Sequence, residues 1–477
     1  MKRREFIKTT AAGIGGLLSV MGARGQDTAA APDKPLRVAI IGCGDRGCHA
    51  ILPNVMTSGM AEMVAFVDPD ARAIARARGR LKKYRPEANV ESVAAFADYR
   101  DFYKQMAGGV DAVFVATPNH QHCLPALLAF RNGNGIHAFV EKPMANTIEE
   151  GRRMLAEARA NRVVTQMGQH GHSNEGARRL CEYVWAGAIG QVTEVYCWCD
   201  RLNAREQPLS DDSACPKELD WDKWIGPAAW RGFNSGLHPV GWYSWRRFGS
   251  ATIGNMGNHV IDPVFWALKL GSPESVQLVD FRPGAEGSWG LRDHIVWKFP
   301  KRGDLAPVEM HWFDGLKGGL HWDDSTWTKG TYKYIVKKEH QNLPPKLVEI
   351  EKKYDVDLGR CASVLIGEKG ILCISVFGES LRFVPDSLRS TIPPPPKTIP
   401  RIRGSHQVDF MRACLGGPAA CANFDYSQPL NEIVLLGVAA IEEGSGRRLD
   451  WDGKAGRFKD AVANKVLSVP SRAGWEA

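Results

Sequence analysis

Residues 36–47, LRVAIIGCGDRG, constrain the fold of this chain more than any other segment. An apolar run rich in β-branched residues predicts a buried strand, and Gly42, Gly44 and Gly47 form the pattern G-x-G-x-x-G where that strand turns into a helix. Gly42 permits the tight turn, Gly44 lets the backbone approach a pyrophosphate, and Gly47 lets the helix pack on the sheet. The helix N-terminus offers free N–H groups to phosphate oxygens. The segment therefore predicts a dinucleotide-binding βαβ unit.

A second predicted strand, residues 63–67, is followed directly by Asp68. This is the spacing at which an acidic side chain binds the ribose hydroxyls of the adenosine half of a dinucleotide. Because a carboxylate would repel a 2′-phosphate, we expect NAD rather than NADP as the cofactor. Arg72, four residues further on, leaves that preference open.

The pattern of apolar runs predicts two domains. Strands expected at 36–42, 62–68, 111–117, 136–141 and 163–168 alternate with helical stretches, which is typical of a doubly wound parallel sheet of the α/β class. After Gln169 a helix is expected at 175–186, followed by longer alternating strands such as 191–200 and 294–299. We expect a Rossmann domain at 35–168, an α+β domain with a mostly antiparallel sheet at 169–450, and a C-terminal tail at 451–477.

The first 31 residues have the pattern of an export signal. Arg3 and Arg4 precede the apolar segment 11–23, which is too short and too glycine-rich for a membrane span of ~20 residues. The pattern is similar to a twin-arginine signal, whose pathway exports proteins already folded. We expect a signal peptide at 1–31, a periplasmic protein, and no stable membrane anchor.

Charge and cysteine content limit the possible partners. The formal net charge is +8, of which the first 31 residues contribute +3, so nothing favours nucleic acid as a partner. The eleven cysteines show no paired spacing, and we expect mostly reduced, buried thiols. The pairs His120/His122 and His170/His172 could converge on zinc, but no carboxylate or thiol ligand accompanies them. We therefore expect no metal, and expect His122, His170 and His172 to line a substrate pocket with Gln169.

Polar residues follow two further predicted strands. Residues 117–120, Thr-Pro-Asn-His, end one of them, and Glu141-Lys142-Pro143 ends the next. The carboxyl ends of such strands are where open α/β sheets bind cofactors, and a lysine there can ease the deprotonation of a reacting hydroxyl. In the loop 238–247, Trp245 and Arg246 suit a carbohydrate, although packing at the domain interface explains them equally well.

These motifs, together with residues 254–262 (GNMGNHVID), resemble the glucose-fructose oxidoreductase/inositol dehydrogenase/rhizopine-catabolism (Gfo/Idh/MocA) superfamily. The resemblance implies a Rossmann domain, then an α/β domain whose open sheet mediates contacts in a homo-oligomer, a dimer or tetramer. It also implies hydride transfer between a nicotinamide and a sugar or polyol carbon. By the same correspondence, Lys142 is the catalytic lysine and His259 the acid/base.

One position departs from the family pattern. The family helix carries Asp four residues before its histidine, and this chain has Asn255 there. An amide can orient a hydroxyl or an imidazole, but it supplies no charge to raise the pKa of His259. Lys142 or another histidine would then take more of the proton transfer, and Asp262, one turn later, would be structural.

Together these arguments define the expected site. The expected cofactor-binding residues are Gly42, Cys43, Gly44, Asp45, Arg46, Gly47, Asp68, Thr117, Pro118, Asn119, His122, Glu141 and Lys142. The expected substrate-binding residues are Gln169, His170, His172, Trp245, Arg246, Asn255 and His259, with Lys142 and His259 catalytic.

The expected function is oxidation or reduction of a sugar or glycoside hydroxyl carbon, with C3 as one candidate, by tightly held NAD. The periplasm has no pool of free nicotinamide cofactor, so an exported enzyme must retain its own. The alternative is an NAD-dependent glycosidase that oxidises, eliminates and reduces in turn. Superfamily members with that chemistry tend to lack the lysine found here at position 142, which favours the dehydrogenase. A third possibility is a cofactor-bound sugar-binding or scaffold protein.

Overall fold

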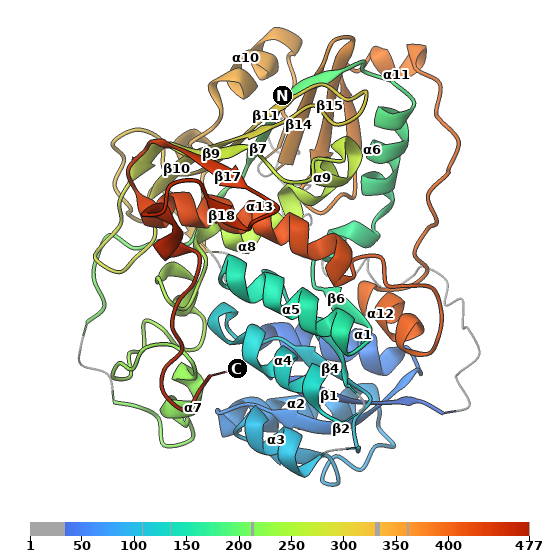
Figure 1. Cartoon of the computed structure of the whole chain (residues 1–477), viewed down its shortest axis with the longest axis vertical. Coiled ribbons are helices and arrows are strands. Elements are labelled where there is room, and N and C mark those ends of the chain that lie inside the picture. Colours follow the sequence, from blue (N-terminus) through green and yellow to red (C-terminus); the bar gives the residue numbers. More distant parts are fainter. Residues whose placement is uncertain are drawn as a thin grey trace, which may run out of the picture.

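The computed structural model of the chain describes residues 34–106, 108–133, 135–210, 214–329, 334–359 and 362–476. The expected signal at 1–31 lies outside these residues. Two domains are stacked on each other, each built on its own sheet, with helices α8 (Ala251–Val260) and α13 (Phe424–Glu443) lying between the sheets (Figure 1).

The N-terminal sheet has six parallel strands in the order β3-β2-β1-β4-β5-β6. Five of its strands lie where the sequence predicts them; β3 is only three residues long and was missed. The strands are β3 (Ala94–Phe96), β2 (Ala61–Val67), β1 (Leu36–Ile41), β4 (Ala112–Val115), β5 (His137–Val140) and β6 (Thr165–Met167). The strand order reverses between β1 and β4, and ligands bind at such a switch point.

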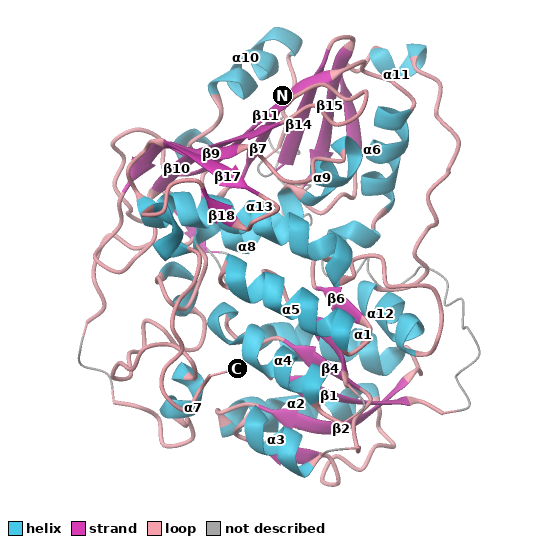
Figure 2. Ribbon diagram, viewed as in Figure 1, coloured by secondary structure: helices cyan, strands magenta, loops and turns pink. Residues whose placement is uncertain are grey.

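Helices cover both faces of this sheet (Figure 2). One face carries α3 (Tyr99–Gln105), α4 (Cys123–Arg131) and α5 (Ile148–Ala160), and the other carries α1 (Leu52–Thr57) and α2 (Ala71–Tyr84). A segment from far along the chain, α12 (His406–Cys414), joins the second face, where Phe410 packs edge-on against Phe114 with ring centroids 5.5 Å apart. The core of the Rossmann domain therefore includes residues well beyond the expected range 35–168.

The second domain is built on a nine-stranded sheet in the order β16-β15-β14-β7-β11-β10-β9-β17-β18. All its pairings are antiparallel except β7 with β11, which confirms the expected mostly antiparallel sheet. The strands are β16 (Leu381–Val384), β15 (Gly370–Ser375), β14 (Ala362–Gly367), β7 (Val192–Trp198), β11 (Val308–Gly315), β10 (Arg292–Phe299), β9 (Ser275–Arg282), β17 (Arg448–Asp452) and β18 (Arg457–Phe458).

The two faces of this sheet are covered unequally. Its inner face packs on α6 (Glu175–Trp185), α8, α9 (Asp262–Leu268) and α13. Its outer face is covered in part by α10 (Pro345–Tyr354), whose Leu347 and Ile350 pack against Trp198 and Phe313. The short helices α7 (Trp221–Ile225) and α11 (Leu388–Thr391) and the small sheet of β12 (Trp327–Lys329), β13 (Tyr334–Val336) and β8 (Arg201–Leu202) complete the domain.

The segment 451–477, expected to be a tail, is an integral part of the structure. Its first residues complete β17 and form β18, and Trp475 near the end is 4% exposed. Trp475 packs against Tyr99 of the Rossmann domain, and Arg100 lies 3.5 Å above its ring. The chain therefore returns to the nucleotide-binding domain after completing the second sheet.

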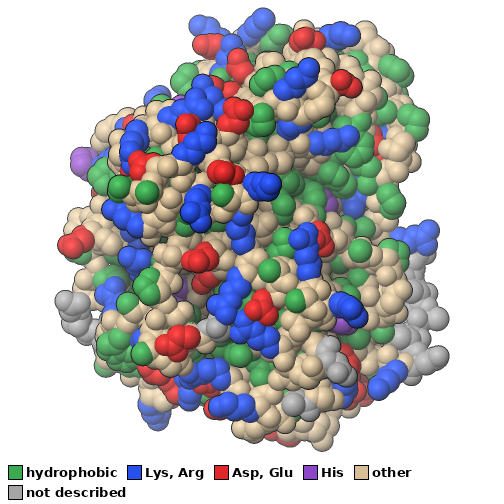
Figure 3. Space-filling model, in the orientation of Figure 1, with side chains coloured by type: hydrophobic (Ala, Val, Ile, Leu, Met, Phe, Trp, Pro, Cys, Tyr) green, Lys and Arg blue, Asp and Glu red, His purple; other side chains and the backbone are tan. Residues whose placement is uncertain are grey.

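Surface charge and helix length are the two features that bear on a membrane span. Side chains of both charges are mixed over the face in Figure 3. No helix among the described residues is both long and apolar enough to cross a membrane. The cysteines in the same residues are all free, and most of them are buried.

Candidate active site

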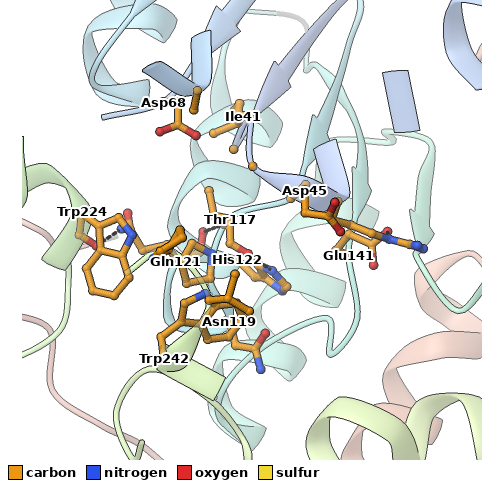
Figure 4. Close-up of a pocket in the computed structure, with 18 of the residues that line it drawn as sticks. Ile41, Asp45, Asp68, Thr117, Asn119, Gln121, His122, Glu141, Trp224 and Trp242 are labelled. Carbon is orange, nitrogen blue, oxygen red and sulfur yellow. Dashed lines mark hydrogen bonds and ion pairs between the residues drawn. The ribbon is translucent and has the colours of Figure 1, made fainter. Parts of the chain in front are cut away.

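A large cavity lies at the carboxyl ends of β1, β2, β4 and β5, with walls from both domains and an empty volume of about 1540 Å³, part of it open to solvent. All of the expected cofactor-binding residues except Cys43 and Gly47 line it. Figure 4 shows Asp68 on one side of the cavity and Glu141 beside Asp45 on another, with Thr117 and His122 between them.

The three glycines of the first turn have different roles. Gly42 has a φ of +93°, and a Cβ there would lie 2.5 Å from the carbonyl carbon of Ala116. A Cβ at Gly47 would lie 2.1 Å from the carbonyl oxygen of Gly42. A Cβ at Gly44, in contrast, would meet no atom within 4 Å. The fold itself requires Gly42 and Gly47, whereas the open space at Gly44 is a cradle that fits a dinucleotide pyrophosphate.

Cys43 does not reach the cavity, contrary to its expected place among the cofactor-binding residues. Its side chain is fully buried among apolar residues behind the turn, and its backbone N–H donates to Oδ2 of Asp68 at 2.7 Å. The side chain of Cys43 therefore belongs to the hydrophobic core. Only its backbone N–H, which binds Asp68, contributes to the site.

Asp68 lines the cavity at the end of β2, as expected for a ribose-binding group. Its carboxylate also accepts the backbone N–H of Asp70 at 2.8 Å, and burial raises its pKa to about 6. Arg72 points elsewhere and pairs with Asp70 at 2.8 Å, while Arg76 of α2 lines the cavity. The arginine that bears on the choice between NAD and NADP is therefore Arg76.

Residues after β4 form part of the cavity wall and hydrogen-bond to neighbouring loops and to Ser250. Nδ2 of Asn119 donates to the hydroxyl of Ser250 at 3.0 Å. The ring nitrogens of His122 lie 2.6 Å from the carbonyl oxygen of Pro143 and 2.9 Å from that of Thr117. His122 therefore connects the loop after β4 to the loop after β5, and burial lowers its pKa.

Lys142, after β5, is held by the second domain. Its Nζ donates to Oδ1 of Asn255 at 2.7 Å and to the backbone oxygen of the same residue at 2.8 Å. Burial, together with the guanidinium groups of Arg46 and Arg201, lowers the pKa of Lys142 to about 7 against the opposing effect of Glu141. Lys142 thus exchanges its proton near neutral pH, the condition that favours general acid–base catalysis.

Asn255 is expected among the substrate-binding residues, but it does not line the cavity. Its amide oxygen accepts from Lys142, and an amide does so without the negative charge that would stabilise the ammonium. Asparagine in place of the family's aspartate therefore affects Lys142, because α8 approaches the end of β5 at Asn255.

His259 lies one turn further along α8 and lines the same cavity. Its ring is edge-on to that of His170, with centroids 5.1 Å apart, and edge-on to Phe377 at 5.0 Å. Next to this group, Glu141 pairs with Nε of Arg46 at 2.6 Å. Lys142, His170 and His259 therefore converge at one end of the cavity, as the sequence predicts.

Besides Asn255, four expected substrate residues do not line the cavity. Nε2 of Gln169 donates to Ser427 at 2.9 Å, and Nδ1 of His172 lies 3.0 Å from a carboxylate oxygen of Asp262. Trp245 packs in an aromatic cluster, and Arg246 pairs with Glu442 at 2.8 Å. Trp245 and Arg246 therefore pack within the protein, which is the alternative that the sequence leaves open for the loop 238–247.

Similar contacts engage two of the four histidines considered for zinc. His120 is buried under α7, where its Nε2 lies 3.1 Å from the carbonyl oxygen of Ile225, and His172 is bound to Asp262. In the described ranges, no three His, Cys, Asp or Glu residues are grouped so as to hold a metal ion.

Several lining residues were missed by the sequence analysis. They are Arg76, Gln121, Arg201, Trp224, His238, Trp242, Tyr243, Phe377 and Trp475. Trp242 and Tyr243 belong to the aromatic loop 238–247, in which they line the cavity and Trp245 and Arg246 do not. Arg201 and Trp475 carry no local signal, because distant segments bring them to the cavity.

The comparisons with known proteins agree with this geometry. A family model described as "Oxidoreductase family, NAD-binding Rossmann fold" matches residues 36–169, and one described as "Oxidoreductase family, C-terminal alpha/beta domain" matches residues 189–290. Glycosyl hydrolase family 109 protein 2 of Shewanella sp. (strain ANA-3) is 36% identical over 24% of this chain and 24% of its own length. D-xylose 1-dehydrogenase [NADP(+)] of Haloarcula marismortui is 28% identical over 35% of this chain and 43% of its own.

These matches span less than half the length of the curated relatives. Among solved structures, a levoglucosan dehydrogenase in complex with NADH and levoglucosan has a TM-score of 0.54 at 18% identity, over 87% of this chain and 99% of its own. That likeness shows the fold. Two models of the Gfo/Idh/MocA oxidoreductase superfamily thus match the Rossmann domain and part of the second domain, which supports a place for the chain in that superfamily.

Proposed function

We propose that this protein is a nicotinamide-dependent oxidoreductase that acts on a hydroxyl carbon of a sugar or glycoside, with C3 as the candidate position. The observation that carries the proposal is Lys142, whose pKa is about 7 and whose Nζ is held by Asn255 in the cavity that Gly44 and Asp68 also line. His170 and His259 supply further proton-binding groups at the same place.

In this proposal, different residues around the cavity bind the dinucleotide and transfer the proton. The turn at Gly44 and the side chain of Asp68 would hold the pyrophosphate and the ribose of the dinucleotide, which when bound supplies the hydride acceptor or donor. Nζ of Lys142 accepts the proton of the substrate hydroxyl, and Asn255 fixes the direction from which it does so. His259 is placed to orient that hydroxyl or to relay the proton to solvent.

The test has a binding arm and an activity arm. Protein purified without added cofactor should release NAD or NADP on denaturation, and mass spectrometry identifies which. Incubation with a panel of sugars and glycosides should then yield a keto-sugar, and Lys142→Ala should lower kcat by ~10²–10⁴-fold with little effect on dinucleotide affinity. Protein that binds neither dinucleotide, or an alanine variant of full activity, would refute the proposal.

A redox-neutral glycosidase is the second candidate, favoured by the relative named glycosyl hydrolase family 109 protein 2. Such an enzyme would release the aglycone from a nitrophenyl glycoside with no net change in NADH absorbance. Net formation of a keto-sugar whose glycosidic bond is intact would favour the dehydrogenase over the glycosidase. Sugar binding without either product would instead support a non-catalytic binding protein.

Export to the periplasm and assembly into a homo-oligomer are part of the same proposal. The twin-arginine pattern at residues 3 and 4 supports export, and replacing both arginines by lysine should leave a reporter fusion in the cytoplasm. The outer face of the nine-stranded sheet beside α10 is the surface expected to mediate a dimer or tetramer. A monomer mass measured by light scattering would contradict the proposed dimer or tetramer.

A further inference from the structure

Arg201 is a charged residue in the cavity for which the described residues provide no charged partner. It lies on β8, in the small sheet of the second domain, and lines the cavity with Lys142 and His259. Its Nη1 contacts Sδ of Met256 at 3.2 Å, and no carboxylate in the described part of the chain pairs with it. A thioether is a weak acceptor, whereas a guanidinium carries five N–H donors in a planar fork. Most of the hydrogen-bonding capacity of Arg201 is therefore left for a ligand.

The charge balance at this end of the cavity is positive. Arg201, Arg46 and Lys142 lie near one another, since both guanidinium groups lower the pKa of the lysine. The nearby carboxylate of Glu141 is engaged by Arg46 at 2.6 Å and is 5% exposed as a side chain. A partly buried guanidinium without a charged partner is unfavourable. An anion beside Arg201 would offset its desolvation and its repulsion by Arg46 and Lys142.

The cofactor phosphates are not the natural partner of Arg201. The pyrophosphate is expected at the turn around Gly44, on the Rossmann side, where Arg46 already lies. Arg201 comes from the opposite domain, and its contact Met256 follows Asn255, the residue that holds the catalytic lysine. Arg201 therefore faces the part of the cavity where the reacting sugar must lie.

We propose that Arg201 binds a carboxylate of the substrate, so that the sugar this protein oxidises is an acid such as a uronate or aldonate. The inference rests on the proposed function and narrows its substrate class. A carboxylate matches the guanidinium fork with two parallel N–H···O bonds, which fixes the sugar in the cavity as well as adding affinity. With its acid group at Arg201, the sugar presents a hydroxyl to Lys142.

The experiment compares matched sugar pairs, glucuronate with glucose and galacturonate with galactose, on the cofactor-loaded protein and on Arg201→Gln. Rates are compared at a pH well above the acidic limb, where Lys142 stays neutral even without the charge of Arg201. There the wild type should prefer the acid in kcat/KM, and Arg201→Gln should lower kcat/KM for the acid by ~10–100-fold while changing that for the neutral sugar less than ~3-fold. Arg201→Lys, which keeps the charge without the fork, should fall between. Arg205→Gln, four residues away and outside the cavity lining, is the matched control.

Calorimetric binding of glucuronate to the NADH-loaded protein, which cannot accept a hydride, gives a readout that needs no turnover, and Arg201→Gln should abolish it. Equal losses on acid and neutral sugars, or a preference for glucose 6-phosphate over glucuronate, would overturn the assignment of a carboxylate. Failure of the proposed function has a different signature: no dinucleotide is bound, and neither member of any pair is oxidised. Thermal unfolding of each variant confirms that it is folded.

Discussion

Replacing Asn255 by aspartate tests the central feature of the site, because the amide oxygen of this residue lies 2.7 Å from Nζ of Lys142. Asn255→Asp changes one atom and places a negative charge at that distance. The charge stabilises the ammonium form, so the pKa of Lys142 should rise from about 7. If the neutral amine is the form that accepts the substrate proton, activity near neutral pH should fall.

The geometry sets the size of the effect. Two unit charges 2.7 Å apart attract each other by about 6 kcal/mol at an effective dielectric constant of 20. Part of this is offset because the new carboxylate must itself be desolvated in a site where Asn255 is fully buried. Opposite charges at such distances commonly move a pKa by ~1–3 units. The acidic limb of kcat/KM should therefore move from near pH 7 to between about pH 8 and pH 10.

The assay is the pH dependence of kcat/KM for the oxidised sugar, measured with the dinucleotide bound. Asn258→Asp is the control: it adds the same charge three residues along α8, at a side chain that bonds to the carbonyl oxygen of Gly254, and it should leave the limb in place. The same shift should persist in a His259→Ala background, because the group that titrates is Lys142. A limb that stays at its wild-type pH in Asn255→Asp, or a shift that disappears without His259, would refute the reasoning.

Three further predictions concern the cavity wall. Gly44→Ala should leave the thermal stability nearly unchanged but weaken dinucleotide binding, whereas Gly47→Ala should lower the melting temperature, because its Cβ would lie 2.1 Å from a carbonyl oxygen; equal effects would contradict these roles. Burial lowers the pKa of Lys142 from 10.5 to about 7, so between these pH values the folded state binds fewer protons than the unfolded state. The free energy that burying the charged lysine costs the folded state therefore falls as the pH rises. Lys142→Met should therefore raise the free energy of unfolding at pH 6, on the order of a few kcal/mol, and by much less near pH 10 in urea titrations; a gain independent of pH would contradict the lowered pKa. Trp475→Ala should increase the rate at which bound dinucleotide exchanges with labelled NAD, since the indole lines the cavity near Tyr99, and an unchanged rate would show that the C-terminal segment does not retain the cofactor.

The sequence by itself determined the Rossmann domain and the groups at its strand ends. Parallel strands alternating with helices leave a clear periodicity, and G-x-G-x-x-G at residues 42–47 reflects a backbone turn that only glycine permits. Because the carboxyl ends of parallel strands meet at one edge, Asp68, Thr117 and Lys142 could be placed in one cavity from their positions after predicted strands.

Only the tertiary structure decided which side chains of the second domain reach that cavity. Gln169 and His172 follow a strand end as closely as His170 does, yet hydrogen bonds to Ser427 and Asp262, more than 80 residues away, turn them inward. Such pairings depend on how helices and loops pack, and no local pattern encodes them. For the same reason Arg201 and Trp475 reach the cavity from a short strand and from the end of the chain, where distant contacts position them.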